Sequence, residues 1–269
     1  MKAVSLKSIF SFPCSIAISL MVVIHSYAEV DLEAARVIFL FDEGSGNTAN
    51  DHSGNGNDGK LVNKPKWVAG KYGKALEFNG TNNYVEVETP HDLPIGAAPR
   101  TICFWFKWSK VAWPDALHEM MGYGQNNPGQ RLGLGLLETA WHSLGIETVL
   151  FARNFEWDAD TKWHHFAAAY PEGAKTTDKF KIYLDGVLHE AENRHPAQNL
   201  NTADAPLVIG CLPNPKLFHF PGRIDEVAIF GEELSADDIN AIAKMGLLDA
   251  QSVSALGKLA TSWGVLKTQ

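Results

Sequence analysis

A polar loop that begins at Asp51 has the residue types and the spacing of a cation site. Asp51, Ser53 and Asn55 stand at alternate positions, and Gly56 follows. This is the first half of a calcium loop, in which oxygen donors at positions 1, 3 and 5 converge on one ion. Val62 stands where such a loop ends in a bidentate glutamate. The loop therefore predicts either a calcium site completed by a distant carboxylate or a solvated Asn-Gly turn.

Asp225 is the candidate for that distant carboxylate. In an extended strand over residues 220–230, both faces are largely apolar, because successive side chains point to opposite sides. Such a strand belongs in the middle of a sheet that is covered on both faces. A carboxylate there needs a partner, because burying an unpaired charge is costly. We expect Asp225 to reach the loop at Asp51 and to close a calcium site with it.

The familiar catalytic and nucleotide-binding templates are incomplete in this chain. Residues 54–60 match two phosphate-binding strings, but Leu61 replaces the required Ser or Thr, and no βαβ pattern surrounds them. The His-Glu pair at 118–119 lacks the second histidine of a zinc protease site. The adjacent acids at 225–226 would point to opposite faces of a strand, so they cannot form a glycosidase pair.

Aromatic side chains in the middle of the chain are candidates for ligand contact. Trp113, Trp141 and Trp157 lie in irregular segments, and Tyr123 lies among them. A flat ring can stack on a sugar, and aromatic residues exposed at a surface mark recognition sites. Tryptophan is also a good core residue, so a purely structural role is the alternative.

The first 28 residues have the pattern of a secretory signal peptide. Lys2 and Lys7 precede an apolar run over residues 9–24, and small residues fit a cleavage site after Ala28. An uncleaved membrane anchor is the alternative, since about 16 apolar residues lie near the lower limit for a membrane span. We expect a secreted or cell-surface protein with no membrane span after the signal.

The net charge bears on the kind of partner, and the two cysteines bear on whether a disulfide forms. The chain of 269 residues has a formal net charge of −8, which becomes −10 when the two lysines of the signal are removed. An acidic surface argues against nucleic acid as a partner. Cys103 and Cys211 remain after signal removal, and an export context permits either a disulfide or two free buried thiols.

Short strand patterns recur along the chain with turn residues between them. Residues 76–78 and 84–88 predict one hairpin, and Asp185-Gly186 predicts another within residues 180–190. Further strands are expected at residues 35–41, 101–108, 131–137, 145–153, 163–170 and 205–211. This rhythm favours an all-β fold of two packed antiparallel sheets.

One short helix is predicted near the C-terminus. Ser235 and Asp238 fit a capping box, and Gly246 is suited to end the helix. The tail over residues 248–269 carries apolar residues at spacings of 3 to 4. This tail is either a second short helix or a docking segment for a partner.

Several short motifs occur in order along the chain. They are FLFDEG at 39–44, DHSGNGNDG at 51–59, WVAGKYGKALEFNG at 67–80, YVEV at 84–87, WHHFA at 163–167, IYLDG at 182–186, IG at 209–210 and GRIDEVAIF at 222–230. In this order they resemble the laminin-G-like jelly-roll domains of secreted bacterial proteins. We therefore expect a signal peptide at 1–28, one such domain at 29–247 and a tail at 248–269.

The resemblance implies a concanavalin A-like sandwich of two curved sheets, with a structural calcium ion at the edge. It implies Asp51 and Asp225 as metal ligands, with backbone carbonyls near Gly80 as an addition. The chain departs from the family pattern at Asn79, which replaces the usual acid. Some relatives are glycosidases that carry a Glu-x-Asp-x-x-Glu strand, and residues 223–225 lack its leading Glu.

These patterns lead to three hypotheses about function. The first is a secreted non-catalytic module, stabilised by calcium, that binds carbohydrate or an extracellular protein. The second is a polysaccharide-active hydrolase that uses acids such as Asp115, Glu119 or Glu138. The third is a structural surface or matrix protein in which the tail after Gly246 mediates assembly.

Overall fold

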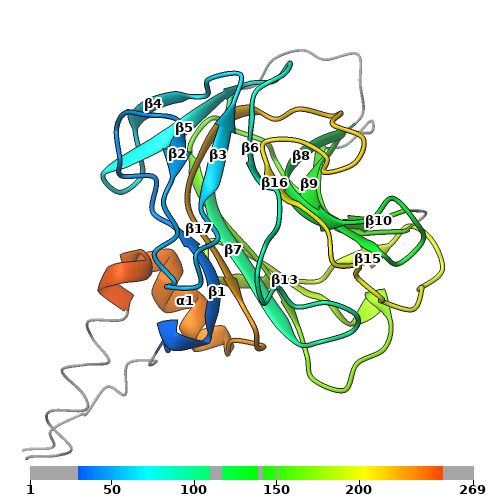
Figure 1. Ribbon diagram of the computed structural model, residues 1–269. Coiled ribbons are helices and arrows are strands. Elements are labelled where there is room, and N and C mark those ends of the chain that lie inside the picture. Colours follow the sequence, from blue (N-terminus) through cyan, green and yellow to red (C-terminus); the bar gives the residue numbers. More distant parts are fainter. Residues whose placement is uncertain (1–29, 110–116, 139–141, 150, 251–269) are drawn as a thin grey trace, which may run out of the picture.

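The fold is a sandwich of two antiparallel sheets (Figure 1). The computed structural model describes residues 30–109, 117–138, 142–149 and 151–250. The expected two-sheet jelly roll is confirmed. Across these described ranges, no helix is both long enough and apolar enough to cross a membrane.

Sheet A contains eight strands, with β17 near its centre between β7 and β5. β17 also pairs with β1, so the stretch at 220–230 is the central strand that its two apolar faces predict. In order across the sheet, the strands are β14 (Val187–His189), β13 (Lys181–Leu184), β12 (Trp163–Tyr170), β7 (Arg100–Trp108), β17 (Pro221–Phe230), β5 (Lys74–Asn79) and β4 (Lys66–Ala69), with β1 (Ala35–Phe39) beside β17.

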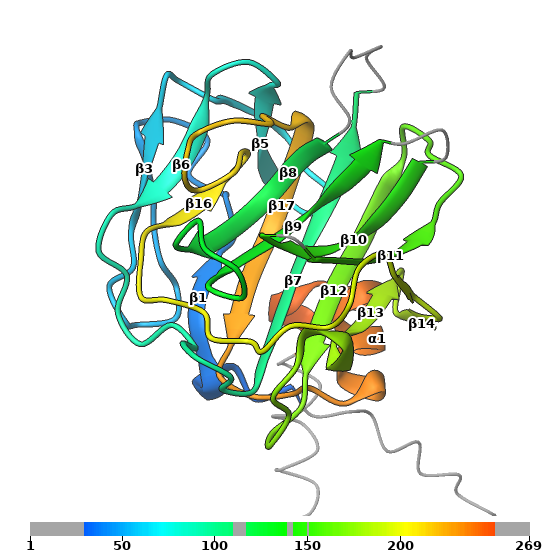
Figure 2. The same cartoon turned by 90° about the vertical axis from the view of Figure 1, so that its right-hand side faces the viewer.

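Sheet B contains nine strands and packs against sheet A. In order across it, the strands are β15 (Glu192–Asn193), β11 (Phe151–Glu156), β10 (His142–Thr148), β9 (Arg131–Glu138), β8 (Leu117–Gly124), β16 (Leu207–Ile209), β6 (Tyr84–Val87), β3 (Gly59–Val62) and β2 (Thr48–Ala49). Figure 2 shows β8 to β11 side by side in front of sheet A.

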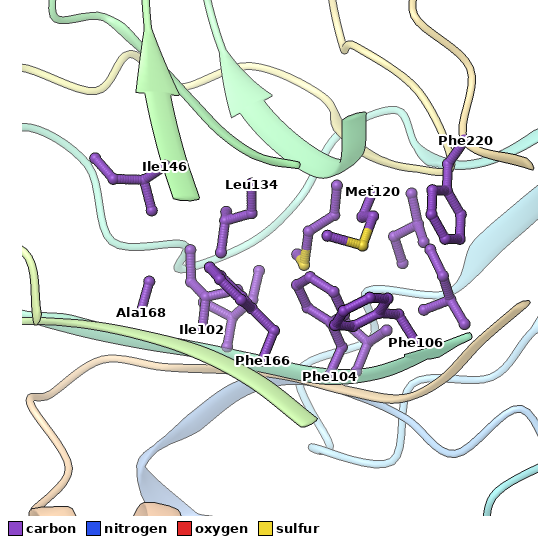
Figure 3. Packing of buried hydrophobic residues seen from close by; sticks show 14 of the residues in the cluster. Ile102, Phe104, Phe106, Met120, Leu134, Ile146, Phe166, Ala168 and Phe220 are labelled. Atoms are coloured by element: carbon purple, nitrogen blue, oxygen red, sulfur yellow. The ribbon is translucent and has the colours of Figure 1, made fainter. Parts of the chain in front are cut away.

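The main core lies between the two sheets (Figure 3). Phe104 and Phe106 of β7 and Phe166 of β12 meet Met120 of β8 and Leu134 of β9 there, and all five side chains are fully buried. This follows from alternation, because every second side chain of a strand faces the partner sheet. Burying one such side chain stabilises the fold by about 1.5–3 kcal/mol.

Helix α1 (Ala236–Met245) packs on the outer face of sheet A (Figure 1). The predicted capping box is confirmed: the Asp238 N–H donates to Ser235 Oγ, and the Ser235 N–H donates to Asp238 Oδ2, both at 3.1 Å. Ile239 and Ile242 join a second apolar cluster on that face. Gly246 ends the helix with a φ of 82°. Two short 3-10 helices, η1 (Leu32–Ala34) and η2 (Thr177–Lys179), complete the described elements.

A bulge in β17 alters the alternation expected for this strand. The register with β7 shifts between residues 225 and 228, and Glu226 in the bulge has a φ of 44°. Ile224 and Val227 consequently share the main core, whereas Ala228 faces the helix side. Simple alternation over residues 220–230 would put Ile224 and Ala228 on one face, and that expectation is wrong, because a bulge residue reverses the alternation beyond it.

The two predicted hairpins have opposite outcomes. The Asp185-Gly186 turn does join β13 to β14. Strands β5 and β6, by contrast, do not pair: β5 pairs with β17 in sheet A, and β6 pairs with β3 and β16 in sheet B. The loop between them carries the chain from one sheet to the other. A local pattern of strand, turn and strand does not distinguish this crossing from a hairpin.

His164 ties the turn at Asp185 to the loop before β12. Its Nδ1 lies 2.8 Å from Asp185 Oδ2, and its Nε2 lies 2.9 Å from Asp160 Oδ1. Burial lowers the pKa of His164, but the hydrogen bonds and charges of the two carboxylates outweigh it and hold that pKa above its usual value. His165 points to the opposite face of β12, as strand alternation requires, and its ring lies 5.4 Å from that of Trp105.

Both described cysteines are free. Cys103 lies in β7 of sheet A, Cys211 follows β16 of sheet B, and both are buried. Burial raises the pKa of the Cys211 thiol to about 12, and it also raises that of Cys103. Both thiols therefore stay protonated and behave as core residues.

Candidate functional site

Asp51 organises the predicted cation loop through hydrogen bonds to the chain itself. Its Oδ1 accepts from the N–H of Ile38 at 3.0 Å and from that of Ser53 at 2.9 Å. Its Oδ2 accepts from Ser53 Oγ at 2.8 Å and from the N–H of Asn57 at 2.9 Å. A carboxylate offers about four lone-pair sites, and these four contacts take them up.

The asparagine side chains of the same loop also bind the chain. Asn55 Nδ2 donates to the carbonyl of Ala35 at 3.1 Å, and Asn57 Nδ2 donates to the carbonyl of Arg36 at 2.8 Å. Asn57 Oδ1 accepts from the His91 N–H at 2.6 Å. The loop is therefore clamped to the start of β1 by its own side chains.

Asp225 holds a different loop. Its Oδ2 accepts from the N–H groups of Lys71 at 2.8 Å and Tyr72 at 3.0 Å, and its Oδ1 accepts from the N–H of Glu226 at 2.9 Å. Burial raises the pKa of Asp225 to about 7, although these three N–H groups lower it. A Cβ on Gly70 would lie 2.5 Å from Asp225 Oδ2, so glycine is required where this loop meets the carboxylate.

The five predicted metal ligands do not assemble into one site. Asp51, Ser53 and Asn55 bind the start of β1, Asp225 binds the loop before β5, and Gly80 lies in the turn after β5. In the described part of the chain, no three His, Cys, Asp or Glu side chains are grouped to hold a metal ion. Because N–H and O–H donors already occupy the Asp51 oxygens, the donor set does not fit calcium, which takes 6–8 oxygen ligands.

A buried cluster of charged side chains lies on the outer face of sheet B. It consists of Glu119 on β8, Arg131 on β9 and Glu147 on β10, with exposed fractions of 0%, 7% and 8%. The core-facing leucines of β9 occupy every second position of the strand. Arg131 occupies one of the other positions, so its side chain points away from the core. Arg131 Nη2 donates to Glu147 Oε1, and Nη1 donates to Asn126 Oδ1 at 2.6 Å. In the ion pair of Arg131 and Glu147, one positive charge is balanced by one negative charge.

Glu119 is the remaining acid of this cluster. A Cβ on Gly133 would stand 2.5 Å from Glu119 Oε1, so the Glu119 side chain lies across bare backbone. Glu147 is the residue opposite Gly133 on β10, and its charge acts on Glu119, whose two carboxyl oxygens are buried and have no hydrogen-bond partner in the described part of the chain. Burial raises the pKa of Glu119 well above its usual range, the charge of Glu147 adds to the rise, and Arg131 opposes it. Glu119 therefore holds its proton to a higher pH than an exposed glutamate does, because an unpaired ionised carboxylate is costly to bury.

The polar face continues to a cavity at the edge of sheet B. Asn154 Nδ2 donates to Ser143 Oγ at 2.7 Å, and Arg194 Nε donates to Asn154 Oδ1 at 3.0 Å. Arg153 Nη1 holds Asn193 Oδ1 at 2.9 Å. Beside them lies a hollow of about 440 Å³, here called the β11–β15 cavity. Its lining residues are Asn154, Phe155, Glu156, Glu190, Glu192, Asn193 and Arg194.

Of the predicted ligand-contacting aromatics, the two in the described part of the chain, Tyr123 and Trp157, do not line this cavity. Tyr123 is fully buried, and its hydroxyl accepts from Arg100 Nη1 at 2.8 Å and donates to the carbonyl of Pro94 at 2.9 Å. Trp157 is 9% exposed and packs edge-on against Phe106. These two rings are core residues and offer no open face to a sugar. Trp113 and Trp141 lie outside the described residues.

Sequence reasoning named Glu119 but missed Arg131, Glu147 and Asn154. One signal was available: leucine and glycine alternate over residues 132–136. In such a strand the leucines occupy one face, and the glycines leave the other face without side chains. That pattern indicates that a side chain from a neighbouring strand lies over the glycines. No local pattern marks Glu147 or Asn154, because their neighbours come from other strands.

Comparison with known proteins identifies the family. A family model described as the concanavalin A-like lectin/glucanases superfamily matches residues 79–240. The chain belongs to this superfamily. A comparison with curated protein sequences gave no match.

Solved structures of low sequence identity share this superfamily fold. Domain 4 of AbnA, a GH43 extracellular arabinanase from Geobacillus stearothermophilus in complex with arabinotriose, is 19% identical with a TM-score of 0.56, and the match covers 78% of this chain and 98% of that one. The botulinum neurotoxin serotype D binding domain is 16% identical with a TM-score of 0.58. The binding domain of Paraclostridial Mosquitocidal Protein 1 is 14% identical with a TM-score of 0.58. The last two matches cover 79% of this chain but 52% of those chains.

Proposed function

We propose that this chain is a non-catalytic carbohydrate-binding module that acts outside the cell and binds its ligand in the β11–β15 cavity. The observation that carries the proposal is the lining of that cavity. It combines amide, carboxylate and guanidinium groups in a hollow of about 440 Å³. This volume lies within the range of small-molecule sites, roughly 300–1,000 Å³.

The lining favours a ligand with many hydroxyl groups. The side chains of Glu156, Glu190 and Glu192 make no hydrogen bond or ion pair within the described residues, and these residues are exposed, so the carboxylates are free to accept from hydroxyls. Asn193 is held by Arg153, and Asn154 is held by Arg194, so the amides are oriented before a ligand arrives. Because the Arg194 guanidinium already donates to Asn154, the three exposed carboxylates favour a neutral sugar over an acidic one.

Solved structures of the same fold support a binding role in general terms. The arabinanase domain was solved with arabinotriose, and the other two structures are binding domains. These are properties of those proteins. For this chain they support a search among neutral oligosaccharides, with arabino-oligosaccharides as a first choice.

The hydrolase alternative has less support in the geometry. Glu147 is paired with Arg131, so it is not a free carboxylate. A glycosidase needs two carboxyl groups that flank the scissile bond of a bound sugar. Glu119 is also 0% exposed, so it does not meet a polysaccharide in this conformation. Asp115 and the Glu138 side chain lie outside the described part of the structure.

The proposal is tested by binding of the full chain to a panel of neutral oligosaccharides, followed by calorimetry on the best ligand. Glu156→Gln and Glu192→Gln keep the side-chain shape and remove the charged acceptor. Each change is expected to weaken binding by about tenfold, since a hydrogen bond to a charged group contributes roughly 1.5–3 kcal/mol.

Glu172→Gln is the matched control, because Glu172 is exposed and lines none of the four described cavities. It should bind like the wild type. Folded protein that binds no sugar on the panel would refute the carbohydrate proposal. Sugar binding that survives both substitutions would place the ligand elsewhere. Release of reducing sugar, lost in Glu119→Gln, would establish the hydrolase instead.

A further inference from the structure

A second cavity lies apart from the β11–β15 cavity. It measures about 680 Å³ and shares no lining residue with that cavity. We call it the Arg36 cavity. Its lining combines Pro90, Pro94, Ile95 and Pro99 with the charged residues Arg36, Asp92 and Asp204.

Arg36 is held in place from both sides. Its carbonyl accepts from Ser53 Oγ at 3.1 Å and from Asn57 Nδ2 at 2.8 Å. Its guanidinium lies against the backbone of Gly231, where a Cβ would stand 2.8 Å from Nε. The clamp built by the Asp51 loop therefore fixes the base of this side chain.

The guanidinium of Arg36 makes no hydrogen bond or ion pair within the described residues. Arginine cannot lose its proton in a protein, so this side chain is a permanent cation with up to five donors. Arg131, Arg194 and Arg223 all donate to an acceptor in the same structure. Arg36 thus offers its planar donor set to whatever enters the cavity.

The facing wall is rigid. Arg100 is fully buried, and its Nη2 and Nε donate to the carbonyls of Gly96 at 2.9 Å and Ala98 at 3.0 Å. Tyr123, which receives a further bond from Arg100, donates to the carbonyl of Pro94 at 2.9 Å. The loop is therefore set before binding, which reduces the entropy lost when a ligand is ordered. Tyr123 therefore supports this wall from its buried side.

We propose that the Arg36 cavity binds a sugar acid, a ligand class that the β11–β15 cavity disfavours. Arg36 receives the ligand carboxylate through two parallel hydrogen bonds, the geometry that a guanidinium favours. Asp92 and Asp204 accept from hydroxyl groups of the same ligand, and they repel ligands with several negative charges. The proline rings and Ile95 contact the C–H faces of the sugar. The proposal does not depend on the neutral-sugar site.

The test measures binding of galacturonate and its trimer to the full chain by calorimetry, with galactose as the neutral counterpart. The galacturonates should bind more tightly than galactose. Arg36→Ala should weaken galacturonate binding by about tenfold or more, and Arg36→Lys should recover only part of it, because lysine keeps the charge but loses the planar fork.

Lys175→Ala is the charge-matched control, since Lys175 is exposed and lines neither cavity. It should leave galacturonate binding unchanged, and melting curves should show every variant folded. Equal binding of galacturonate and galactose, or undiminished galacturonate binding by Arg36→Ala, would overturn the assignment. Tighter binding of an amino acid such as serine would assign Asp92 and Asp204 to an ammonium group and also overturn it. Glu156→Gln should not change galacturonate binding, so the result for the Arg36 cavity is independent of the result for the β11–β15 cavity.

Discussion

The buried cluster on sheet B provides a sharp test, because its two glutamates should respond in opposite ways to the same substitution. Glu119→Gln replaces an acid whose pKa is raised by a neutral amide of nearly the same shape. Glu147→Gln removes the charge that balances the buried Arg131. The first change leaves the ion pair intact, and the second destroys it.

The expected magnitudes differ clearly. Breaking a buried ion pair by removing one partner costs about 3–5 kcal/mol, because a charge is left uncompensated. Arg131 and Glu147 are 7% and 8% exposed, so this estimate applies to them. Glu119→Gln exchanges one neutral polar group for another of similar size and leaves the ion pair intact, so its effect at pH 5 should stay within about 1 kcal/mol.

The pH dependence distinguishes the variants further. The folded-state pKa of Glu119 lies above its ordinary value of 4.5, so the folded protein binds this proton more tightly than the unfolded chain. The wild type therefore loses stability as the pH rises from 4.5 toward the folded-state pKa. Glu119→Gln removes this loss, and its stability relative to the wild type should improve as the pH rises.

Urea unfolding of the wild type and both variants at pH 5, 7 and 9 measures these effects. Glu172→Gln serves as the control for a change of one surface charge. If Glu119→Gln were as destabilising as Glu147→Gln, or if its relative stability fell with rising pH, Glu119 would be ionised and the reasoning would be refuted.

Three further predictions follow from other sites. Burial raises the pKa of Asp225 to about 7 from 3.8, so the melting temperature of the wild type should fall between pH 5 and pH 8. Asp225→Asn should reduce that fall. A melting temperature of the wild type that does not change with pH would contradict the prediction. The pKa of His164 is raised, so its stabilising effect should be complete below pH 6.5 and disappear at higher pH, which NMR titration and unfolding of His164→Gln can check; an unshifted titration would count against it. Because the oxygens of Asp51 are already occupied, chelator should leave the melting temperature unchanged, and a drop on chelation would show that a metal does contribute.

The sequence alone determined the class of fold and several local features. The two apolar faces of 220–230 led correctly to a central strand, and the Asp185-Gly186 turn led to a hairpin. Ser235 and Asp238 led to a capped helix. These features depend on residues that are close in the chain, so their chemistry can be read from spacing. The ordered motifs then indicated the family, which the match over residues 79–240 confirms.

Only the tertiary structure decided which side chains meet. Asp51 and Asp225 were expected to share an ion, yet each accepts hydrogen bonds from the backbone of a separate loop. The bulge at Glu226 and the passage of the chain from β5 to β6 depend on pairing with distant strands. Glu119 meets Glu147 over Gly133 because three strands bring them together. Spacing in sequence describes neighbours along one strand, whereas sites on a sheet are built across strands, and that register is set by the packing of the whole sandwich.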